Sequence, residues 1–231
     1  MPLLARRRLH RFFDVPVQDL VLRVAGPQDL YEEARAAGLH FWEQVQSYAI
    51  RHPEFRTSKR PLPVPPEAPP IVREMVQSSA AAGVGPMFTF QGALTEYVGR
   101  RLAPALSEVV VSCGGDHFVI ARRRARLAVR PPTRGGRDAL AVVVKPELGP
   151  HGIYTTVGRV HLPREGADGL VVVARSCLLA DAAAAAASAI LSRPGSCRPA
   201  LDYLNGLDGV HGAIVIRGAR IGVAGALELA A

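Results

Sequence analysis

Two glycine-rich segments and one acidic residue supply the groups of this chain that could bind a ligand. Gly83-Val84-Gly85-Pro86-Met87 precedes an apolar segment, Cys113-Gly114-Gly115-Asp116 follows a run of valines, and Asp181 lies in an alanine-rich stretch. Exposed backbone N–H groups at a helix N-terminus attract phosphate or carboxylate. Glycines at a strand end let a ligand approach the backbone closely. These segments predict a site for a small molecule with anionic groups.

Each segment also has a purely structural interpretation. The first can be an ordinary turn between two helices, and the Gly-Gly-Asp sequence can be a glycine-rich β-turn. Asp181 can interact with the dipole of its own helix. Cys113 can be a reactive thiol or a buried, inert one. The residue types and their spacing leave these alternatives open.

Hydrophobic periodicity predicts the elements that position these residues. The first helix is expected to begin at Pro27 and to end before Pro53. Further helices are expected over 70–82, 87–103, 176–191 and 199–207. The expected strands cover 8–14, 17–25, 109–111, 116–121, 125–129, 139–144, 170–174, 210–216 and 220–224, with Pro16 and Gly218 at hairpin turns.

This order of elements predicts an α/β (α+β) fold with a mixed sheet layered with helices. We expect one domain spanning 1–231. The segment 56–70 contains six prolines and no apolar periodicity, so it is interpreted as an internal linker packed on the surface.

The formal net charge of +8 comes with arginine clusters at 6–8, 100–101 and 122–124. A basic surface attracts phosphate-bearing partners, although the same clusters are typical of solvated strand ends. Nucleic-acid binding is disfavoured because no aromatic residues interleave the arginines and no nucleic-acid-binding motif is visible. Three widely spaced cysteines, and the lack of a signal peptide or an apolar run long enough for a membrane span, predict a cytoplasmic protein.

The ordered set of motifs resembles the ApbE-like superfamily, which includes the FAD:protein FMN transferases. The motifs are Gly-Val-Gly-Pro at 83–86, Gly-Gly-Asp at 114–116, Ala-Asp-Ala at 180–182, His-Pro-Glu-Phe at 52–55 and Gly-Val-x-Gly-x-x-Val-Ile at 209–216. The last two are typical of a smaller cytoplasmic branch whose activity is unsettled. The resemblance covers nearly the whole chain and implies a single ApbE-like, T-fold-like domain.

The resemblance also implies a ligand and a site. It implies FAD or a related nucleotide as the small-molecule partner, Mg²⁺ held through Asp181, and a homo-oligomer. The implied nucleotide-binding residues are Gly83, Gly85, Pro86, Met87, Gly114, Gly115, Asp116, Thr155 and Thr156.

Four positions depart from the transferase pattern. Gln91 stands where the pattern has Lys, Glu96 where it has Asp, Ala185 where it has a metal-binding Thr, and Cys113 where it has Asn. We therefore expect weak or absent Mg²⁺-dependent FMN transfer. The leading hypothesis is a flavin- or nucleotide-binding protein with altered or weakened transferase chemistry. The alternative is a non-catalytic small-molecule binding or scaffold module that retains the fold.

Overall fold

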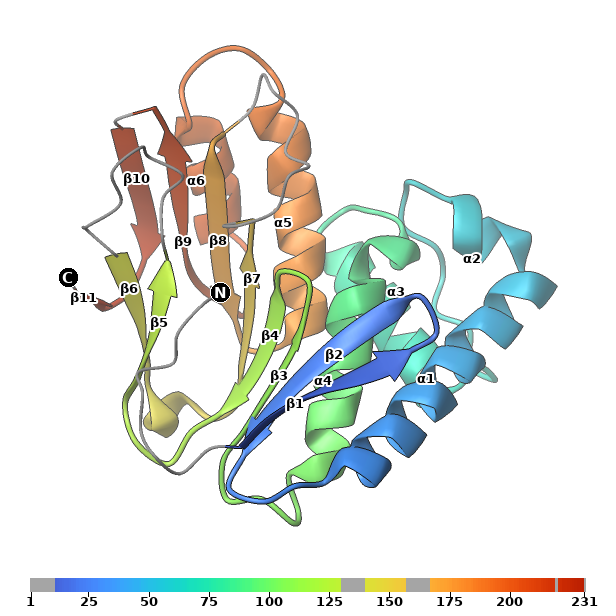
Figure 1. Cartoon of the computed structure of the whole chain (residues 1–231). Coiled ribbons are helices and arrows are strands. Elements are labelled where there is room, and N and C mark those ends of the chain that lie inside the picture. Colours follow the sequence, from blue (N-terminus) through green and yellow to red (C-terminus); the bar gives the residue numbers. More distant parts are fainter. Residues whose placement is uncertain (1–10, 130–139, 157–166, 219, 231) are drawn as a thin grey trace.

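The computed structural model describes residues 11–129, 140–156, 167–218 and 220–230. A long, curved sheet carries the main helices on one face and a small second sheet on the other (Figure 1). The helices are α1 Tyr31–Arg51, α2 Pro53–Thr57, α3 Pro70–Ala81, α4 Phe90–Leu102, α5 Cys177–Leu191 and α6 Arg198–Asn205, with 3₁₀ turns η1 Pro86–Thr89 and η2 Pro146–Leu148.

The strands form two sheets within the described residues. The order in the eight-stranded sheet is β1-β2-β3-β4-β7-β8-β9-β10, and in the smaller one β11-β6-β5. The strands are β1 Arg11–Val17, β2 Leu20–Gly26, β3 Val109–Cys113, β4 Asp116–Ile120, β5 Ala125–Val129, β6 Leu140–Val144, β7 His151–Thr155, β8 Gly169–Ala174, β9 Val210–Arg217, β10 Arg220–Gly225 and β11 Leu229–Ala230.

The predicted layering of helices on a sheet is confirmed, with one difference. Every strand pairing in the described part of the chain is antiparallel, whereas a mixed sheet was expected. Short hairpins join β1 to β2, β3 to β4 and β9 to β10, and so short a connection can only join antiparallel strands.

Strand β8 shows how the two layers share one sheet. Leu170 and Val172 pack with α5 and α6, while Val171 and Val173 pack against the small sheet. Both faces of the strand are therefore buried, which explains its continuous apolar sequence. Helix α5 lies on the helix-covered face of the eight-stranded sheet, next to α4, and the two helices contact each other directly.

Two local predictions were wrong. The first hairpin turns at Gln18–Asp19 rather than at Pro16, which lies within β1 opposite Val21. Proline is tolerated there because β1 is the edge strand of the described sheet, where one row of backbone N–H groups is not needed for pairing. The segment 151–155 was not predicted as a strand, yet it forms β7 between β4 and β8.

Most other boundaries lie within a few residues of expectation, although α1 begins at Tyr31 and not at Pro27, and α2 and β11 were not predicted. The helix predicted for 87–103 is divided into η1 and α4. In the proline-rich segment, Arg56 and Thr57 complete α2, and the chain continues without a helix or strand to Pro69. Leu62 and Ala68 pack against the helical core, so this segment belongs to the folded structure. The organisation of 1–231 as one domain stays a prediction.

Candidate functional site

A cavity of about 470 Å³ lies where η1, the start of α4, β7 and α5 meet. Its lining residues come from parts of the sequence that are up to about a hundred positions apart. They are Met87, Phe88, Phe90, Gln91, Tyr154, Asp181, Ala185 and Ser188. Two of the predicted site residues, Met87 and Asp181, are therefore brought to one cavity.

Helix α5 presents three of these residues along one face. Asp181, Ala185 and Ser188 are spaced four and three residues apart, which places them on successive turns of the same side. The helix begins after Ser176, whose hydroxyl oxygen accepts a hydrogen bond of 3.1 Å from the N–H of Leu179. This N-cap and the high helix propensity of alanine fix the start of the helix and the direction of that face.

Asp181 also joins α5 to α4. Its Oδ2 accepts a hydrogen bond of 3.1 Å from the backbone N–H of Gly92. A β-carbon at Gly92 would lie 2.5 Å from the carbonyl oxygen of Cys177 and 3.0 Å from the β-carbon of Asp181. The glycine therefore allows the close approach of the two helices, and one oxygen of the carboxylate is used to hold them together.

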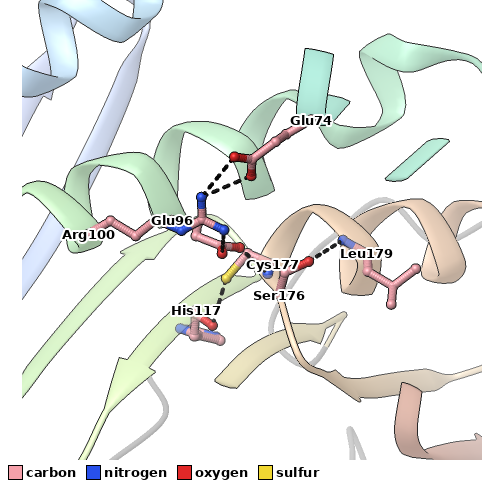
Figure 2. A network of polar contacts seen from close by, with 7 residues as sticks. All are labelled: Glu74, Glu96, Arg100, His117, Ser176, Cys177 and Leu179. Carbon is pink, nitrogen blue, oxygen red and sulfur yellow. Dashed lines mark hydrogen bonds and ion pairs between the residues drawn. The ribbon is translucent and has the colours of Figure 1, made fainter. Parts of the chain in front are cut away.

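Glu96 makes the second link between these helices (Figure 2). It is 2% exposed, and its Oε2 accepts a hydrogen bond of 2.6 Å from the backbone N–H of Cys177. Its Oε1 accepts from Arg100, which also pairs with Glu74. Burial raises the pKa of Glu96, while Arg100 and the Cys177 N–H oppose that shift. The network fixes the first turn of α5, about two turns before the cavity-lining residue Ala185.

Cys177 is part of this buried network and not a reactive group. Its thiol donates to the backbone carbonyl of His117 at 3.1 Å. Burial, with the nearby Glu96 and Asp116 carboxylates, raises the pKa of the thiol well above its ordinary value. A thiolate is the nucleophilic form, so this environment makes the sulfur inert. Cys113 is buried as well.

The glycine-rich turn before η1 is built mainly by contacts within the protein. Gly83 has φ +73° at the end of α3, and the N–H of Val84 bonds to the carbonyl of Ser79 at 2.9 Å. A β-carbon at Gly85 would lie 1.9 Å from the carbonyl oxygen of Ser58. Pro86 is the buried first residue of η1. Of the predicted residues in this turn, Met87 alone lines the cavity.

The Gly-Gly-Asp turn lies beside the cavity without lining it. Asp116 is 1% exposed and pairs with Tyr154 across β4 and β7, so its side chain is buried in the folded sheet. The carbonyl of Gly115 accepts a bond of 2.8 Å from the N–H of Thr155. Gly114 is the exposed residue at the tip of the turn.

Thr155 and Thr156 are buried in the sheet. Thr156 accepts from the N–H of Leu170 through its hydroxyl at 2.8 Å and donates its own N–H to the carbonyl of Leu170 at 3.0 Å. Thr156 therefore holds the end of β7 to β8. His161, a few residues further along the chain, lies outside the described residues.

Among the residues that the structure describes, the donor set around Asp181 does not fit a magnesium site. One carboxylate oxygen of Asp181 is bonded to the Gly92 N–H, and Ala185 offers no oxygen at the position where the transferase pattern has Thr. Within the described ranges, no group of three or more His, Cys, Asp or Glu side chains could hold a metal ion. Mg²⁺ prefers six oxygen ligands in a regular geometry, and this cavity supplies few of them.

A larger hollow of about 670 Å³ lies elsewhere, between α1 and the end of α4. Its lining is mostly apolar, with Glu33 and Arg101 as charged members. None of the predicted site residues lines it. We place the candidate site in the smaller cavity, because it is lined by Asp181, Met87 and Tyr154, the last of which pairs with Asp116 of the Gly-Gly-Asp turn.

The arginine clusters are partly neutralised by nearby carboxylates. Arg100 pairs with Glu74 and Glu96, and Arg124 pairs with Glu147 and Glu228. The cluster at 6–8 lies outside the described residues. No helix that the structure describes combines the length and the apolar character needed to cross a membrane.

Solved flavin transferases share this fold. The flavin transferase ApbE of Vibrio cholerae superposes with a TM-score of 0.63 at 10% identity, covering 93% of this chain and 97% of that one. The apo flavinyl transferase ApbE of Pseudomonas stutzeri gives 0.59 at 14% identity, over 93% and 94%. The ApbE protein of Thermotoga maritima gives 0.60 at 11% identity, over 93% and 97%. The chain thus has the ApbE-like flavin transferase fold, which confirms the predicted fold class.

Sequence comparison then defines the family. The family model described as "AbpE bacteria" matches residues 3–203. A UPF0280 protein of Methanopyrus kandleri is 30% identical over 217 residues, which is 90% of this chain and 86% of the relative. A UPF0280 protein of Methanococcus aeolicus is 26% identical over 75% of this chain and 73% of the relative. The chain belongs to this ApbE-like family, as its ordered motifs predicted.

Sequence reasoning missed most of the apolar lining of the cavity. Phe88 and Phe90 follow the glycine-rich turn directly, and an aromatic pair beside a predicted site is a signal that could have been used. Ser188 was detectable as the next residue on the face of Asp181 and Ala185. Tyr154 required the strand β7, whose five residues include two polar positions and a glycine.

Proposed function

We propose that the cavity binds a flavin nucleotide or a closely related nucleotide. One observation carries the proposal: a cavity of about 470 Å³, within the usual range for small-molecule sites, is lined by three aromatic rings and a methionine at the place where Met87 and Asp181 of two family motifs meet. Phe88, Phe90 and Tyr154 supply flat apolar surface for a ring system, and Met87 supplies an adaptable, polarizable contact.

The polar groups of the cavity suit the edge of a heteroaromatic ring. The amide of Gln91 carries both a donor and an acceptor, and the hydroxyl of Ser188 can act as either. A few such groups among apolar walls are the usual way in which a pocket fixes the orientation of its ligand. The solved proteins of this fold that are named flavin transferases support the choice of a flavin.

We further propose that binding does not depend on Mg²⁺ and that FMN transfer is weak or absent. The support is the donor set described above, in which Gly92 occupies one oxygen of Asp181 and position 185 is alanine. The same observation favours the second candidate function, a non-catalytic module that retains the pocket. Both candidates predict ligand binding, and they differ in whether any transfer occurs.

Titration of the purified chain with FAD and with FMN tests the proposal. Flavin fluorescence is followed in the presence of EDTA and, separately, of excess Mg²⁺. We expect saturable one-site binding with the same dissociation constant in both solutions. The absence of binding would contradict the proposed ligand, and binding that requires Mg²⁺ would contradict the interpretation of Asp181.

A transfer assay separates the two candidates. FAD, Mg²⁺ and an acceptor protein carrying the transferase target sequence are incubated with the chain, and covalent flavin on the acceptor is measured by mass spectrometry. Slow labelling would support weakened transferase chemistry, and no labelling would support the non-catalytic module. Turnover of roughly one per second or faster, which is usual for enzymes, would show that the losses at positions 91 and 185 do not matter.

A further inference from the structure

We infer that helix α1 is a surface for self-association, on which the last turn of α1 from a second copy of this chain covers the hollow between α1 and the end of α4. Leu30, Glu33 and Ala36 line this hollow on its α1 side. The hollow measures about 670 Å³, and its walls are mostly apolar. Helix α1 lies at the outer end of the helical layer, beyond α4 and α5 (Figure 1).

An exposed isoleucine on the same helix is the apolar group that fits against this hollow. Ile50 lies in the last turn of α1 and is 72% exposed, more than any other large hydrophobic side chain that the structure describes. Burial of such a side chain is favourable. Ile50 and Ala36 are roughly 21 Å apart along the helix, so Ile50 cannot reach the hollow of its own chain. A second molecule can bring the two together.

Two charged residues of α1 show the same complementarity. Glu33 and Arg51 are 18 positions apart, which is five helical turns, so both side chains leave α1 on one face. Both are exposed, and neither forms an ion pair with a described residue. Arg51 donates instead to the carbonyl of Ser47 at 3.1 Å. The two charges lie roughly 27 Å apart along the helix and cannot pair within one chain.

An antiparallel pair of α1 helices about a twofold axis satisfies both features at once. In such an interface a contact of residue i with residue j is repeated as a contact of j with i. Glu33 of each copy then meets Arg51 of the other, and Ile50 of each copy packs at the Ala36 edge of the other hollow. The start of one helix also lies beside the end of the other, which is favourable for their dipoles.

The charges decide both the orientation and the occupant. A parallel pair would place Glu33 beside Glu33 and Arg51 beside Arg51, and like charges in contact are unfavourable. The hollow, the exposed Ile50 and the two opposite charges all belong to one helix. A second copy therefore supplies every group that the surface needs. Arg101, which lines the hollow from the end of α4, forms no ion pair with Glu33 and leaves this carboxylate available.

The first test is the self-association of an Ile50 variant, measured by sedimentation velocity over a range of protein concentrations. We expect a dimer for the wild type. Ile50→Gln should weaken dimer formation by about tenfold or more, the usual effect of losing buried aliphatic contacts. Ile221→Gln is the matched control, since Ile221 is 53% exposed on β10, and it should associate like the wild type.

A charge exchange tests the antiparallel contact. Glu33→Arg and Arg51→Glu should each weaken the dimer by about tenfold, because each places like charges together at two points. A mixture of these two variants should form a heterodimer, since both contacts then join opposite charges. A misfolded chain could not give this rescue. Arg35→Glu, at an exposed position on another side of α1, should leave the dimer unchanged.

Each of three results would overturn the inference. A wild type that stays monomeric at every concentration would leave this surface to a different partner. A dimer that Ile50→Gln does not weaken would form through another face of the molecule. Failure of the mixed charge variants to associate would exclude the antiparallel contact of Glu33 with Arg51.

Discussion

The carboxylate of Glu96 accepts a hydrogen bond of 2.6 Å from the backbone N–H of Cys177, and so ties the middle of α4 to the first turn of α5. Four residues earlier, the N–H of Gly92 donates to Asp181 on α5. The acid and the glycine of one sequence element thus hold the helix that carries one wall of the cavity. Much of what resembles a catalytic motif in this chain acts as a helix-to-helix contact.

Replacement of Glu96 by glutamine should change how stability depends on pH. Burial raises the pKa of Glu96 above its ordinary value of 4.5, so this carboxyl stabilises the fold below about pH 4.5, and that contribution is lost as the pH rises through the folded-state pKa. The stability of the wild type relative to Glu96→Gln should therefore fall as the pH rises above about 4.5. Urea unfolding at several pH values measures it.

Glu74→Gln is the control for this experiment, since Glu74 is the more exposed partner of the same Arg100. Its pH profile should follow that of the wild type. A relative stability of the wild type that grows with rising pH would mean that the ion pair with Arg100 outweighs the burial of Glu96.

Gly92→Ala should separate α4 from α5. The new β-carbon would lie 2.5 Å from the Cys177 carbonyl oxygen, which belongs to a helix and cannot move easily. Alanine gains about 1 kcal/mol of helix propensity, but overpacking of this kind costs about 1–3 kcal/mol and the bond to Asp181 is strained as well. We expect a net loss of about 1–2 kcal/mol in the free energy of unfolding.

Gly206→Ala is the matched control for that substitution. At Gly206 the nearest atom to a new β-carbon is 3.4 Å away and the backbone is helical, so the change should be neutral or slightly stabilising. Equal stability of the two variants would show that the approach of α4 to α5 at Gly92 is not tight.

Asp116→Ala should act on stability more than on ligand affinity, the reverse of what an exposed turn would give. The residue is 1% exposed and lies on β4, between β3 and β7, so removal of its carboxylate changes a buried polar site at a cost of about 1–3 kcal/mol. Thermal melting and FMN titration of the same variant separate the two effects. A loss of FMN affinity with an unchanged melting temperature would restore Asp116 to the ligand site.

The fold should lose stability in mild acid through His151. Burial and the neighbouring His211, whose ring centre lies 5.8 Å away, lower the pKa of His151 below its ordinary value of 6.5. The unfolded chain then binds a proton first, so stability is lost as the pH falls below about 6.5 and through the folded-state pKa. Glu147 and Arg175 are the other charged groups that act on this pair.

The measurement for this prediction compares three proteins between about pH 7 and 5, the range around the ordinary histidine value. His151→Gln should lose less stability than the wild type over this range, and His40→Gln, at an exposed histidine, should lose as much as the wild type. Identical losses in all three would assign the acid sensitivity to other groups.

The sequence was sufficient for the layers of the fold and for the family. Long helices with regular apolar spacing and β-branched strands such as Val109–Cys113 are determined by local patterns. Strand β7 was missed because His151, Gly152, Tyr154 and Thr155 have low apolar content and the strand is stabilised by β4 and β8. That tertiary pairing also decides the burial of Asp116, which no local pattern reports.

The sequence predicted the location of the candidate site better than the residues that line it. Asp181 and Met87 reach the cavity as the motif order implied, whereas Gly83 and Gly85 serve backbone geometry and the threonines serve the sheet. A glycine that lets a ligand approach and a glycine that lets another backbone segment approach look the same in the sequence. Only the neighbours in three dimensions distinguish the two cases.

The measurement that tests the central claim most directly is the FMN affinity of a variant with a blocked cavity. Ala185→Phe places a ring inside the cavity, and Ala189→Phe places the same ring on an exposed position of the same helix. The account predicts that Ala185→Phe weakens FMN binding by about tenfold or more, while Ala189→Phe and the wild type agree within about twofold. Equal FMN affinity of both variants and the wild type would place the ligand elsewhere and contradict the account.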